Sequence, residues 1–188
     1  MTELQTKINS KIFKLLQGDI TQQETDAIVN AANERLAPGG GVAGAIHRAA
    51  GPMLWRECKK LGGCMTGEAK MTRGYRLKAP YVIHTVGPVY TGAQSDPRYL
   101  AECYRNSLWV ADENSLESIS FPAISTGIFG YPVEEAAEVA IKTILDTIPS
   151  LSTVSEVRLV LYSETSLKTH MRVFKEILKQ RNFLISEQ

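Results

Sequence analysis

Short apolar segments alternate with stretches of helical spacing along the chain, and this alternation constrains the fold more than any other feature. The strand-like segments are Lys11–Leu16, Ala27–Val29, Tyr81–Val86, Ile119–Ile124 and Val157–Tyr162. The helical patterns are Ala43–Lys60, interrupted or bent at Gly51-Pro52, then Arg98–Asn114, Pro132–Ile148 and Ser166–Gln180. Strands separated by helices need crossover connections, so the sequence predicts an α/β fold with a largely parallel sheet and helices on both faces.

Composition limits the number of domains and the classes of partner. A chain of 188 residues favours one domain with a substantial core, so we expect residues 1–188 to form a single domain. Apolar residues make up 44% and charged residues 22%, which is an ordinary globular balance. The formal net charge of +1 gives no general attraction to nucleic acid or to anionic lipid. A phosphate ligand would therefore be held by local geometry rather than by a basic surface.

The chain also lacks the sequence signs of membrane insertion and of secretion. No apolar run is long enough for a membrane span, and the segment MTELQTKINSKIFKLLQGD lacks the apolar core of a signal peptide. Cys58, Cys64 and Cys103 are odd in number, and no two have CxxC spacing. We therefore expect a cytoplasmic protein with reduced thiols, rather than a disulfide framework or a structural zinc site. A catalytic Cys–His pair is the less favoured alternative.

Three successive glycines precede the helix that begins near Val42. Gly39-Gly40-Gly41 lets the backbone take positive φ and approach a ligand closely, and the amides at the helix start then face an anion. The alternative is a flexible turn without a ligand. Neither GxGxxG nor GxxxxGK[ST] occurs here, so the dinucleotide fingerprint and the P-loop do not apply.

A second loop, Ser125–Gly130, follows the strand at Ile119–Ile124 and precedes the helix near Pro132. It offers two hydroxyls and two glycines without a lysine, so its backbone amides could hold a diphosphate with little side-chain charge. Sheets of this kind bind ligands beyond the carboxyl ends of their strands. Two such loops, each after a strand, predict one diphosphate held from both sides.

Two further strand ends carry side chains suited to a purine. Asp19, in the segment GDIT, could accept a hydrogen bond from an exocyclic amine, or it could cap the following turn. Tyr162 ends the last strand and could stack on an aromatic ligand, or it could be an edge of the core.

The three histidines make no ligand spacing with acids or cysteines, so we expect no metal site. His47 lies on the helix after the glycines, and its position alone makes it part of the helix face. His84 lies in an apolar strand pattern, which predicts a core position. His170 lies on the last helix, where we expect it to be exposed.

Six motifs in a fixed order, from about Leu15 to Lys179, resemble the macrodomain family and in particular its MacroD-type branch. They are GDIT, DAIVNAAN, GGGV-x-GAIHRAAG, YVIHTVGP, FPAISTGIFGYP and LVLYSE. The resemblance implies a three-layer α/β/α fold with a central mixed, largely parallel sheet that holds ADP-ribose. It also implies removal of ADP-ribose from acidic side chains and deacetylation of O-acetyl-ADP-ribose.

The same resemblance assigns roles to the adenine and ribose contacts. Asp19 would bond the adenine amino group, the Ile20 amide would meet the ring, and Tyr162 would lie against the adenine. Asn33, which ends Asn30-Ala31-Ala32-Asn33, would bond the distal ribose, the one farther from the adenine. Asn30 is interpreted as a structural asparagine that bonds the loop backbone.

The two glycine-containing loops would hold the rest of the ligand. By the resemblance, Gly40, Gly41 and Val42 would line the distal ribose and its neighbouring phosphate. The diphosphate would be enclosed by Ser125, Thr126, Gly127, Ile128 and Phe129, with Phe129 packed beside the distal ribose.

One position departs from the MacroD-type pattern. Those enzymes usually carry an acid where this chain has Ala43, and that acid is thought to orient or activate water near the distal ribose. Residues 43 and 47 are one helical turn apart, so such an acid would pair with His47. The catalytic positions implied are therefore Asn33, Ala43 and His47. Some viral macrodomains that are regarded as hydrolases also read GGGVAG, so Ala43 does not exclude turnover.

Two functions from different classes follow. The first is a hydrolase of ADP-ribose esters, acting on O-acetyl-ADP-ribose and on ADP-ribosylated proteins, with activity lowered by Ala43. The second is a module that reads ADP-ribose without cleaving it. An RNA-binding module has little support, because there is no stripe of basic and aromatic residues. We expect a monomer with no cofactor, no membrane contact and no nucleic-acid partner.

Overall fold

The computed structural model describes residues 3–184 and 186–187, and within them the chain forms one mixed sheet. The strands are β1 (Glu3–Ile8), β2 (Lys11–Gln17), β3 (Ala27–Ala31), β4 (Ala69–Arg73), β5 (Tyr81–Thr85), β6 (Ser118–Phe121), β7 (Glu156–Leu161) and β8 (Ser186–Glu187). Their order in the sheet is β4-β5-β3-β6-β7-β2-β1-β8. Parallel ladders join β5 to β2 through the middle of the sheet, and antiparallel pairs add β4, β1 and β8 at its edges. The predicted largely parallel sheet is confirmed.

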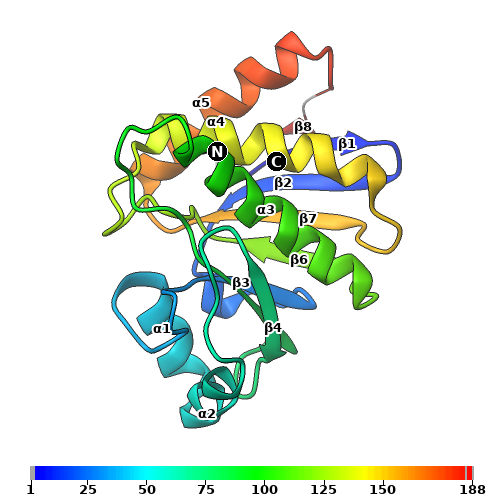
Figure 1. The fold of residues 1–188 in the computed structure, drawn as a ribbon. Coiled ribbons are helices and arrows are strands. Elements are labelled where there is room, and N and C mark those ends of the chain that lie inside the picture. Colours follow the sequence, from blue (N-terminus) through cyan, green and yellow to red (C-terminus); the bar gives the residue numbers. More distant parts are fainter. Residues whose placement is uncertain (1–2, 185, 188) are drawn as a thin grey trace.

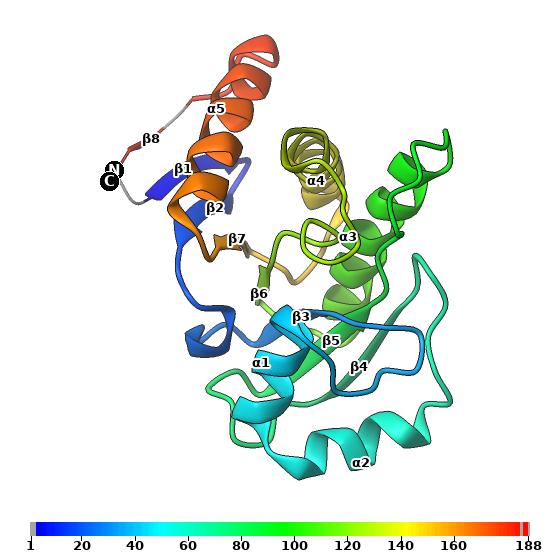
Figure 2. The same cartoon turned by 90° about the vertical axis from the view of Figure 1, so that its left-hand side faces the viewer.

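Helices cover the sheet from two sides. They are α1 (Gly41–Ala50), α2 (Pro52–Lys60), α3 (Asp96–Glu113), α4 (Val133–Thr147) and α5 (Glu164–Gln180), with the short 3-10 helices η1 (Ile20–Gln22) and η2 (Ile148–Ser150). Figures 1 and 2 show α1 and α2 on one side of the sheet and α3, α4 and α5 on the other. The three-layer α/β/α fold implied by the resemblance is confirmed. The expected break at Gly51 is also present, because this glycine has φ 84° between α1 and α2.

Two apolar clusters fill the space on either side of the sheet. Strand alternation sends Ala27 and Val29 of β3 toward α3–α5, while Ile28 between them faces α1 and α2. On the α3–α5 side, Phe13 of β2 meets Phe174 of α5 edge to face, with ring centroids 5.2 Å apart. The parallel strands are thus buried by helices, and their carboxyl ends remain for a ligand.

His170 is not exposed, and that prediction is wrong. The side chain is buried on α5, where Nδ1 donates to the Ser166 carbonyl at 2.8 Å. The reason is that α5 packs against both the sheet and α4, so the buried part of its surface is wider than the strip that a single contact would cover. The prediction had treated α5 as a surface helix with one buried face.

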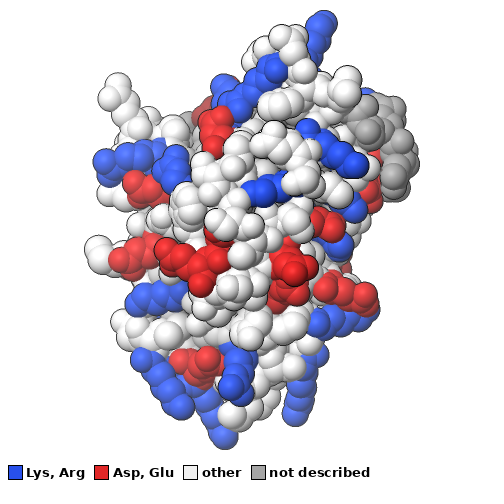
Figure 3. Space-filling view, turned by 90° about the vertical axis from the view of Figure 1, so that its right-hand side faces the viewer, with Lys and Arg blue, Asp and Glu red and all other residues white. Residues whose placement is uncertain are grey.

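The surface carries charges of both signs. Figure 3 shows acidic and basic side chains interspersed over the face opposite to the one seen in Figure 2. Among the described residues, no helix is both long and apolar enough to cross a membrane. The same residues contain no group of three His, Cys, Asp or Glu side chains that could hold a metal ion.

Candidate functional site

Four parallel strands end at the same edge of the sheet, and the segment after each one carries a predicted site residue. The strands are β3, β6, β7 and β2, in that spatial order. The chain leaves β3 toward β5 on one side but later reaches β6 on the other, so this edge is a topological switch point. Since neighbouring strands lie about 4.8 Å apart, the four segments extend over about 14 Å. The predicted residues therefore form one elongated site.

The glycine loop after β3 presents free amides at the start of α1. Gly40 is the N-cap, and Gly41 has φ 53°, a left-handed conformation that favours glycine. Within residues 3–184, no hydrogen bond uses the amides of residues 39–43. At Gly44 a Cβ would lie 2.3 Å from the Gly39 carbonyl oxygen, so this glycine lets the loop fold back over the helix. Unbonded amides at a helix N-terminus suit an anion.

The loop after β6 also presents its backbone. Ser125 has φ 65°, its carbonyl accepts the Tyr131 amide at 2.9 Å, and the Gly130 amide donates to the Gly127 carbonyl at 3.0 Å. The amides of residues 127–129 make no hydrogen bond within residues 3–184, and Ile128 is fully exposed. This loop lies at the same end of the sheet as the glycine loop, because β3 and β6 are parallel neighbours. Together the two loops offer hydrogen-bond donors without a lysine or an arginine.

The two hydroxyls of this loop play a different part from its amides. Thr126 Oγ1 donates to the Ala123 carbonyl at 2.8 Å. Ser125 is buried, and its Oγ has no partner in the described residues. A Cβ on Gly87 would lie 2.1 Å from that oxygen, so Gly87 allows the segment after β5 to pack against the loop. The loop thus offers backbone rather than hydroxyls to a ligand.

At the other end of the site, Asp19 and Tyr162 follow the adjacent strands β2 and β7. The Gly18 amide donates to the Leu161 carbonyl at 3.0 Å, which keeps the two strand ends together. Asp19 Oδ1 accepts the Thr21 amide at 2.8 Å, so the capping role is real, while the side chain remains exposed to a ligand. Tyr162 is 82% exposed, so the alternative of a core edge is wrong. Ile20, beside Asp19, is buried against the α1 and α2 cluster.

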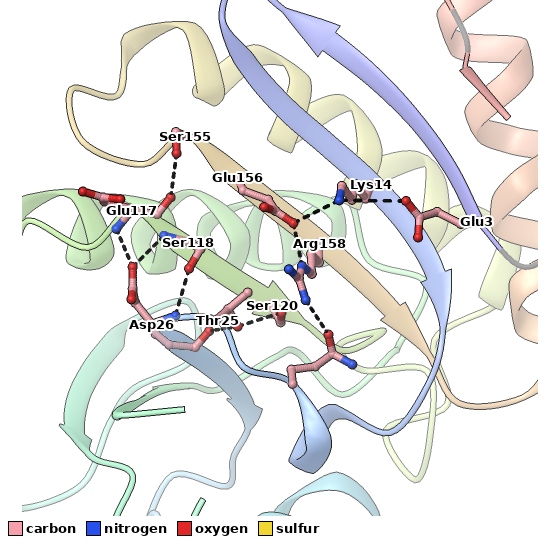
Figure 4. A network of polar contacts seen from close by, with 12 residues as sticks. Glu3, Lys14, Thr25, Asp26, Glu117, Ser118, Ser120, Ser155, Glu156 and Arg158 are labelled. Carbon is pink, nitrogen blue, oxygen red and sulfur yellow. Dashed lines mark hydrogen bonds and ion pairs between the residues drawn. The ribbon is translucent and has the colours of Figure 1, made fainter. Parts of the chain in front are cut away.

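A polar network around Arg158 and Glu156 supports this end of the site (Figure 4). Arg158 on β7 donates through Nε to Glu156 at 2.7 Å and through Nη1 to Gln23 at 3.2 Å. Gln23 Nε2 in turn donates to the Asp19 carbonyl at 3.4 Å. Partial burial would raise the pKa of Glu156, but the hydrogen bond and charge of Arg158, together with Lys14, lower it below its usual value. The turn that carries Asp19 is therefore tied to charged side chains on the sheet.

Ala43 and His47 lie one turn apart on α1, and both are buried. The two ring nitrogens of His47 have no partner in the described residues, and burial lowers the pKa of this histidine, so it is neutral near pH 7. Its ring meets Trp55 edge to face at 6.4 Å and lines a hollow of about 480 Å³ together with Gly39. An acid at position 43 would give His47 the partner that it lacks.

The Asn33 side chain makes two hydrogen bonds to the segment just before the glycines. Its Nδ2 donates to the Ala37 carbonyl at 2.9 Å, and its Oδ1 accepts the Ala37 amide at 3.0 Å. The amide group lies 3.7 Å from the place where a Cβ on Gly39 would be. Asn33 is therefore beside the glycines, as the predicted ribose contact requires, with one N–H and one lone pair still open to a ligand.

Comparison with known proteins decides the family. The family model described as Macro domain matches residues 29–140. The chain belongs to the Macro domain family. It is 49% identical to the ADP-ribose glycohydrolase MACROD2 of Xenopus laevis over 93% of this chain and 43% of that protein. It is 48% identical to the O-acetyl-ADP-ribose deacetylase of Salmonella typhimurium over 87% of this chain and 94% of the relative.

Solved macrodomain structures agree with this fold. The Oceanobacillus iheyensis macrodomain with ADP superimposes with a TM-score of 0.91 at 39% identity, covering 95% of this chain and 97% of that one. The Trypanosoma brucei macrodomain in complex with ADP-ribose superimposes with a TM-score of 0.81 at 43% identity, covering 85% of this chain and 68% of that one. The similarity therefore extends over nearly the whole of this macrodomain.

A buried polar cluster under α2 corrects the interpretation of Asn30. Its Nδ2 donates to His84 Nδ1 at 3.1 Å, rather than to the loop backbone. His84 therefore carries its proton on Nε2 and donates to Thr72 Oγ1 at 2.8 Å. Asn30 Oδ1 has no partner in the described residues. The sequence offered no signal for this contact, because the two residues are brought together only by the pairing of β3 with β5.

Cys58 lies close to His84, with Sγ 3.7 Å from Nε2, but the pair is not a nucleophile and base. Burial raises the pKa of Cys58 to about 11, and burial together with the charge of His47 lowers the pKa of His84 to about 3. Neither group is charged near pH 7, so no thiolate forms. Cys58, Cys64 and Cys103 are all free and buried.

Proposed function

We propose that this macrodomain binds ADP-ribose along the strand-end site and hydrolyses esters at the distal ribose. The substrates would be proteins ADP-ribosylated on Asp or Glu, and O-acetyl-ADP-ribose. The observation that carries the proposal is the pair of adjacent loops with unbonded amides at residues 39–43 and 127–129. The named activities of the Xenopus and Salmonella relatives add support.

The layout of the site suits the parts of the ligand in order. Tyr162, Asp19 and Ile20 lie at the β7 and β2 end and would hold the adenine. The two loops follow β3 and β6 at the other end and would hold the diphosphate by charge-assisted hydrogen bonds, which need no lysine. Asn33 and Phe129 belong to the same two segments after β3 and β6 and would contact the distal ribose.

In hydrolysis, water adds across the ester, and ADP-ribose leaves with the hydroxyl at its distal ribose while the acyl group leaves as a carboxylic acid. The neutral, buried His47 has no carboxylate partner, so it cannot act as part of a charged pair. The water would instead be positioned by the ribose, a substrate phosphate and the loop amides. Loss of a general base costs about 10²–10⁴-fold, which leaves slow turnover.

The decisive experiment compares the wild-type chain with Ala43→Asp on a glutamate-ADP-ribosylated protein. The new carboxylate would lie at the N-terminus of α1, where its charge is favourable, one turn before His47. We expect kcat to rise about tenfold or more, while the Kd for ADP-ribose changes little. Ala43→Asn is the matched control, because it has the same shape without the base, and it should give no gain.

Two outcomes would overturn parts of this proposal. If ADP-ribose bound no more tightly than AMP, the two-loop site would be wrong, since we expect a preference of at least about 1.4 kcal/mol. If ADP-ribose bound but neither the wild type nor Ala43→Asp released it from protein, the alternative of a non-catalytic reader would replace the hydrolase. Ala43 is the observation that favours that alternative.

A further inference from the structure

A second hollow opens beside the distal-ribose end of the proposed site. Its volume is about 420 Å³, and it shares Asn33 and Phe129 with that site. Its other walls include Glu34, Arg35 and Val89, none of which has a role in holding ADP-ribose itself. The hollow is therefore continuous with the site but extends beyond the ligand.

Backbone hydrogen bonds join the segments that form its walls, so the hollow is built into the fold. The bonds run from the Cys64 amide to the Glu34 carbonyl, from the Gly67 amide to the Val86 carbonyl, and from the Tyr90 amide to the Phe129 carbonyl, each at 2.9 Å. At Gly63, which has φ 95°, a Cβ would lie 2.8 Å from the Glu34 carbonyl oxygen. A hollow with such fixed walls loses little entropy when it is filled.

The side chains around the hollow combine exposed apolar surface with uncompensated charge. Val89 is 58% exposed, and Met65, next to the wall residue Thr66, is 70% exposed. Glu34 and Arg35 are exposed, and neither makes an ion pair within residues 3–184. Apolar side chains with a few polar groups are typical of a ligand-binding surface.

We propose that this hollow is an acceptor subsite, which takes the polypeptide segment that carries the ADP-ribosylated Asp or Glu. This inference rests on the proposed function, because it needs the distal ribose beside Asn33 and Phe129. A group attached to that ribose must leave the site next to these two residues. An acetyl group would occupy a small part of the hollow, whereas a side chain with its flanking backbone would reach Val89 and Arg35.

The consequence is a preference for ADP-ribose that is attached to protein. Contacts with Val89 and Arg35 add affinity only when a polypeptide follows the ribose. Free ADP-ribose and O-acetyl-ADP-ribose lack that part and should be indifferent to these residues. Glu34 and Arg35 lie in the same wall, so an acidic neighbour of the modified side chain gains affinity only where it meets Arg35 rather than Glu34.

Calorimetry with two probes tests the subsite without relying on turnover. One probe is free ADP-ribose, and the other is a short peptide whose glutamine side chain carries ADP-ribose through a stable amide, with apolar and acidic neighbours. In the wild type we expect the conjugate to bind at least about threefold more tightly than ADP-ribose. Val89→Glu and Arg35→Glu should remove that advantage and leave the Kd for ADP-ribose unchanged. Met53→Glu on α2 and Arg105→Glu on α3 are matched exposed controls and should retain it.

A turnover measurement provides the second readout. Val89→Glu should lower kcat/KM for a glutamate-ADP-ribosylated protein about threefold or more, with kcat/KM for O-acetyl-ADP-ribose nearly unchanged. Equal losses on both substrates would overturn the subsite, as would a wild-type conjugate that binds no more tightly than ADP-ribose. Failure of ADP-ribose itself to bind would instead overturn the proposed function, on which the subsite depends.

Discussion

The two ends of the strand-end site are built from different parts of the chain. At the glycine-loop end, the unbonded backbone amides of residues 39–43 and 127–129 would provide the donors. At the proposed adenine end, the exposed side chains of Asp19 and Tyr162 would provide the contacts, and hydrogen bonds from Arg158 to Gln23 and from Gln23 to the Asp19 carbonyl hold the turn that carries Asp19. The contacts with the ligand would therefore come from the backbone at one end and from side chains at the other.

This difference decides how each end can be disrupted. Removing a side chain can change the adenine end but leaves the backbone donors of the glycine-loop end untouched. Adding a side chain to the glycine loop would instead disrupt that end, because a diphosphate would need the space next to the glycine backbone. The predictions below use this contrast, from the largest expected effect to the smallest.

Gly40→Glu should abolish ADP-ribose binding, with a loss of more than about a hundredfold, or about 2.7 kcal/mol. Gly40 has φ −89°, and a Cβ there would meet nothing within 4 Å, so the fold should survive. The anionic side chain would occupy the loop surface and repel the diphosphate. Gly41→Glu is a poorer test, because φ 53° at that position would strain any side chain.

Calorimetry checks this prediction, with circular dichroism to confirm folding. Gly40→Ala is the matched control, because it adds a methyl group without charge, and it should bind far better than Gly40→Glu. Normal binding by a folded Gly40→Glu variant would place the diphosphate elsewhere and end the contrast between the two ends.

Titratable groups near the two ends should also lose their contributions to the free energy of unfolding in different pH ranges. Beneath the glycine-loop end, burial and the charge of His47 lower the pKa of His84 to about 3, while its unfolded value is about 6.5. Between these values the unfolded chain binds a proton that the folded chain does not. The free energy of unfolding therefore falls as pH falls from 6.5, by about 2 kcal/mol from His84 at pH 5.

Behind the adenine end, Glu156 has a lowered pKa, so its contribution is present above about pH 4.5 and is lost only below it. Urea unfolding at pH 7 and pH 5 separates the two effects. His84→Gln should show a smaller loss between these pH values, by about 2 kcal/mol, while His47 and His170 leave a residual slope. An unchanged slope in His84→Gln would contradict the assignment.

Much of this arrangement could be predicted from the sequence, because local signals carried it. The order of the five parallel strands and of the helices followed from periodicity, and the glycine runs marked the loops since only glycine tolerates those conformations and close approaches. The core position of His84 followed from its apolar strand context. These features depend on residues that are close together in the sequence.

The remainder depends on contacts between distant segments. β4 has a polar, half-buried pattern that resembles a loop, and it becomes a strand only by pairing with β5. The hydrogen bond of Asn30 to His84 and the burial of His170 likewise arise from packing across the sheet. The acceptor hollow needs segments around residues 34, 66, 87 and 129, which no local pattern joins.

Asp19→Ala should weaken ADP-ribose binding about tenfold or more, since a hydrogen bond to a charged group contributes about 1.5–3 kcal/mol. Part of that loss would come from the cap that Asp19 Oδ1 makes with the Thr21 amide. Asp19→Asn separates the two roles, because its carbonyl oxygen can still cap while its amide nitrogen cannot accept from adenine. Calorimetry should find both variants weakened, whereas normal binding by Asp19→Asn would make Asp19 a cap alone.

The smallest effect is expected at Tyr162, whose ring would cover one face of the adenine. Stacking of a base on an aromatic side chain is worth about 1–3 kcal/mol, and we expect the lower limit, about fivefold, because the ring is 82% exposed and competes with water. Tyr162→Ala should therefore weaken ADP-ribose and AMP by the same factor, since both contain the adenine, while ribose 5-phosphate is unaffected. Tyr162→Phe keeps the ring and should bind normally. If Tyr162→Ala weakened ADP-ribose but not AMP, the ring would contact some other part of the ligand. The adenine would then be held by Asp19 and Ile20 alone, and the division of the site into a backbone end and a side-chain end would lose one of its two supports.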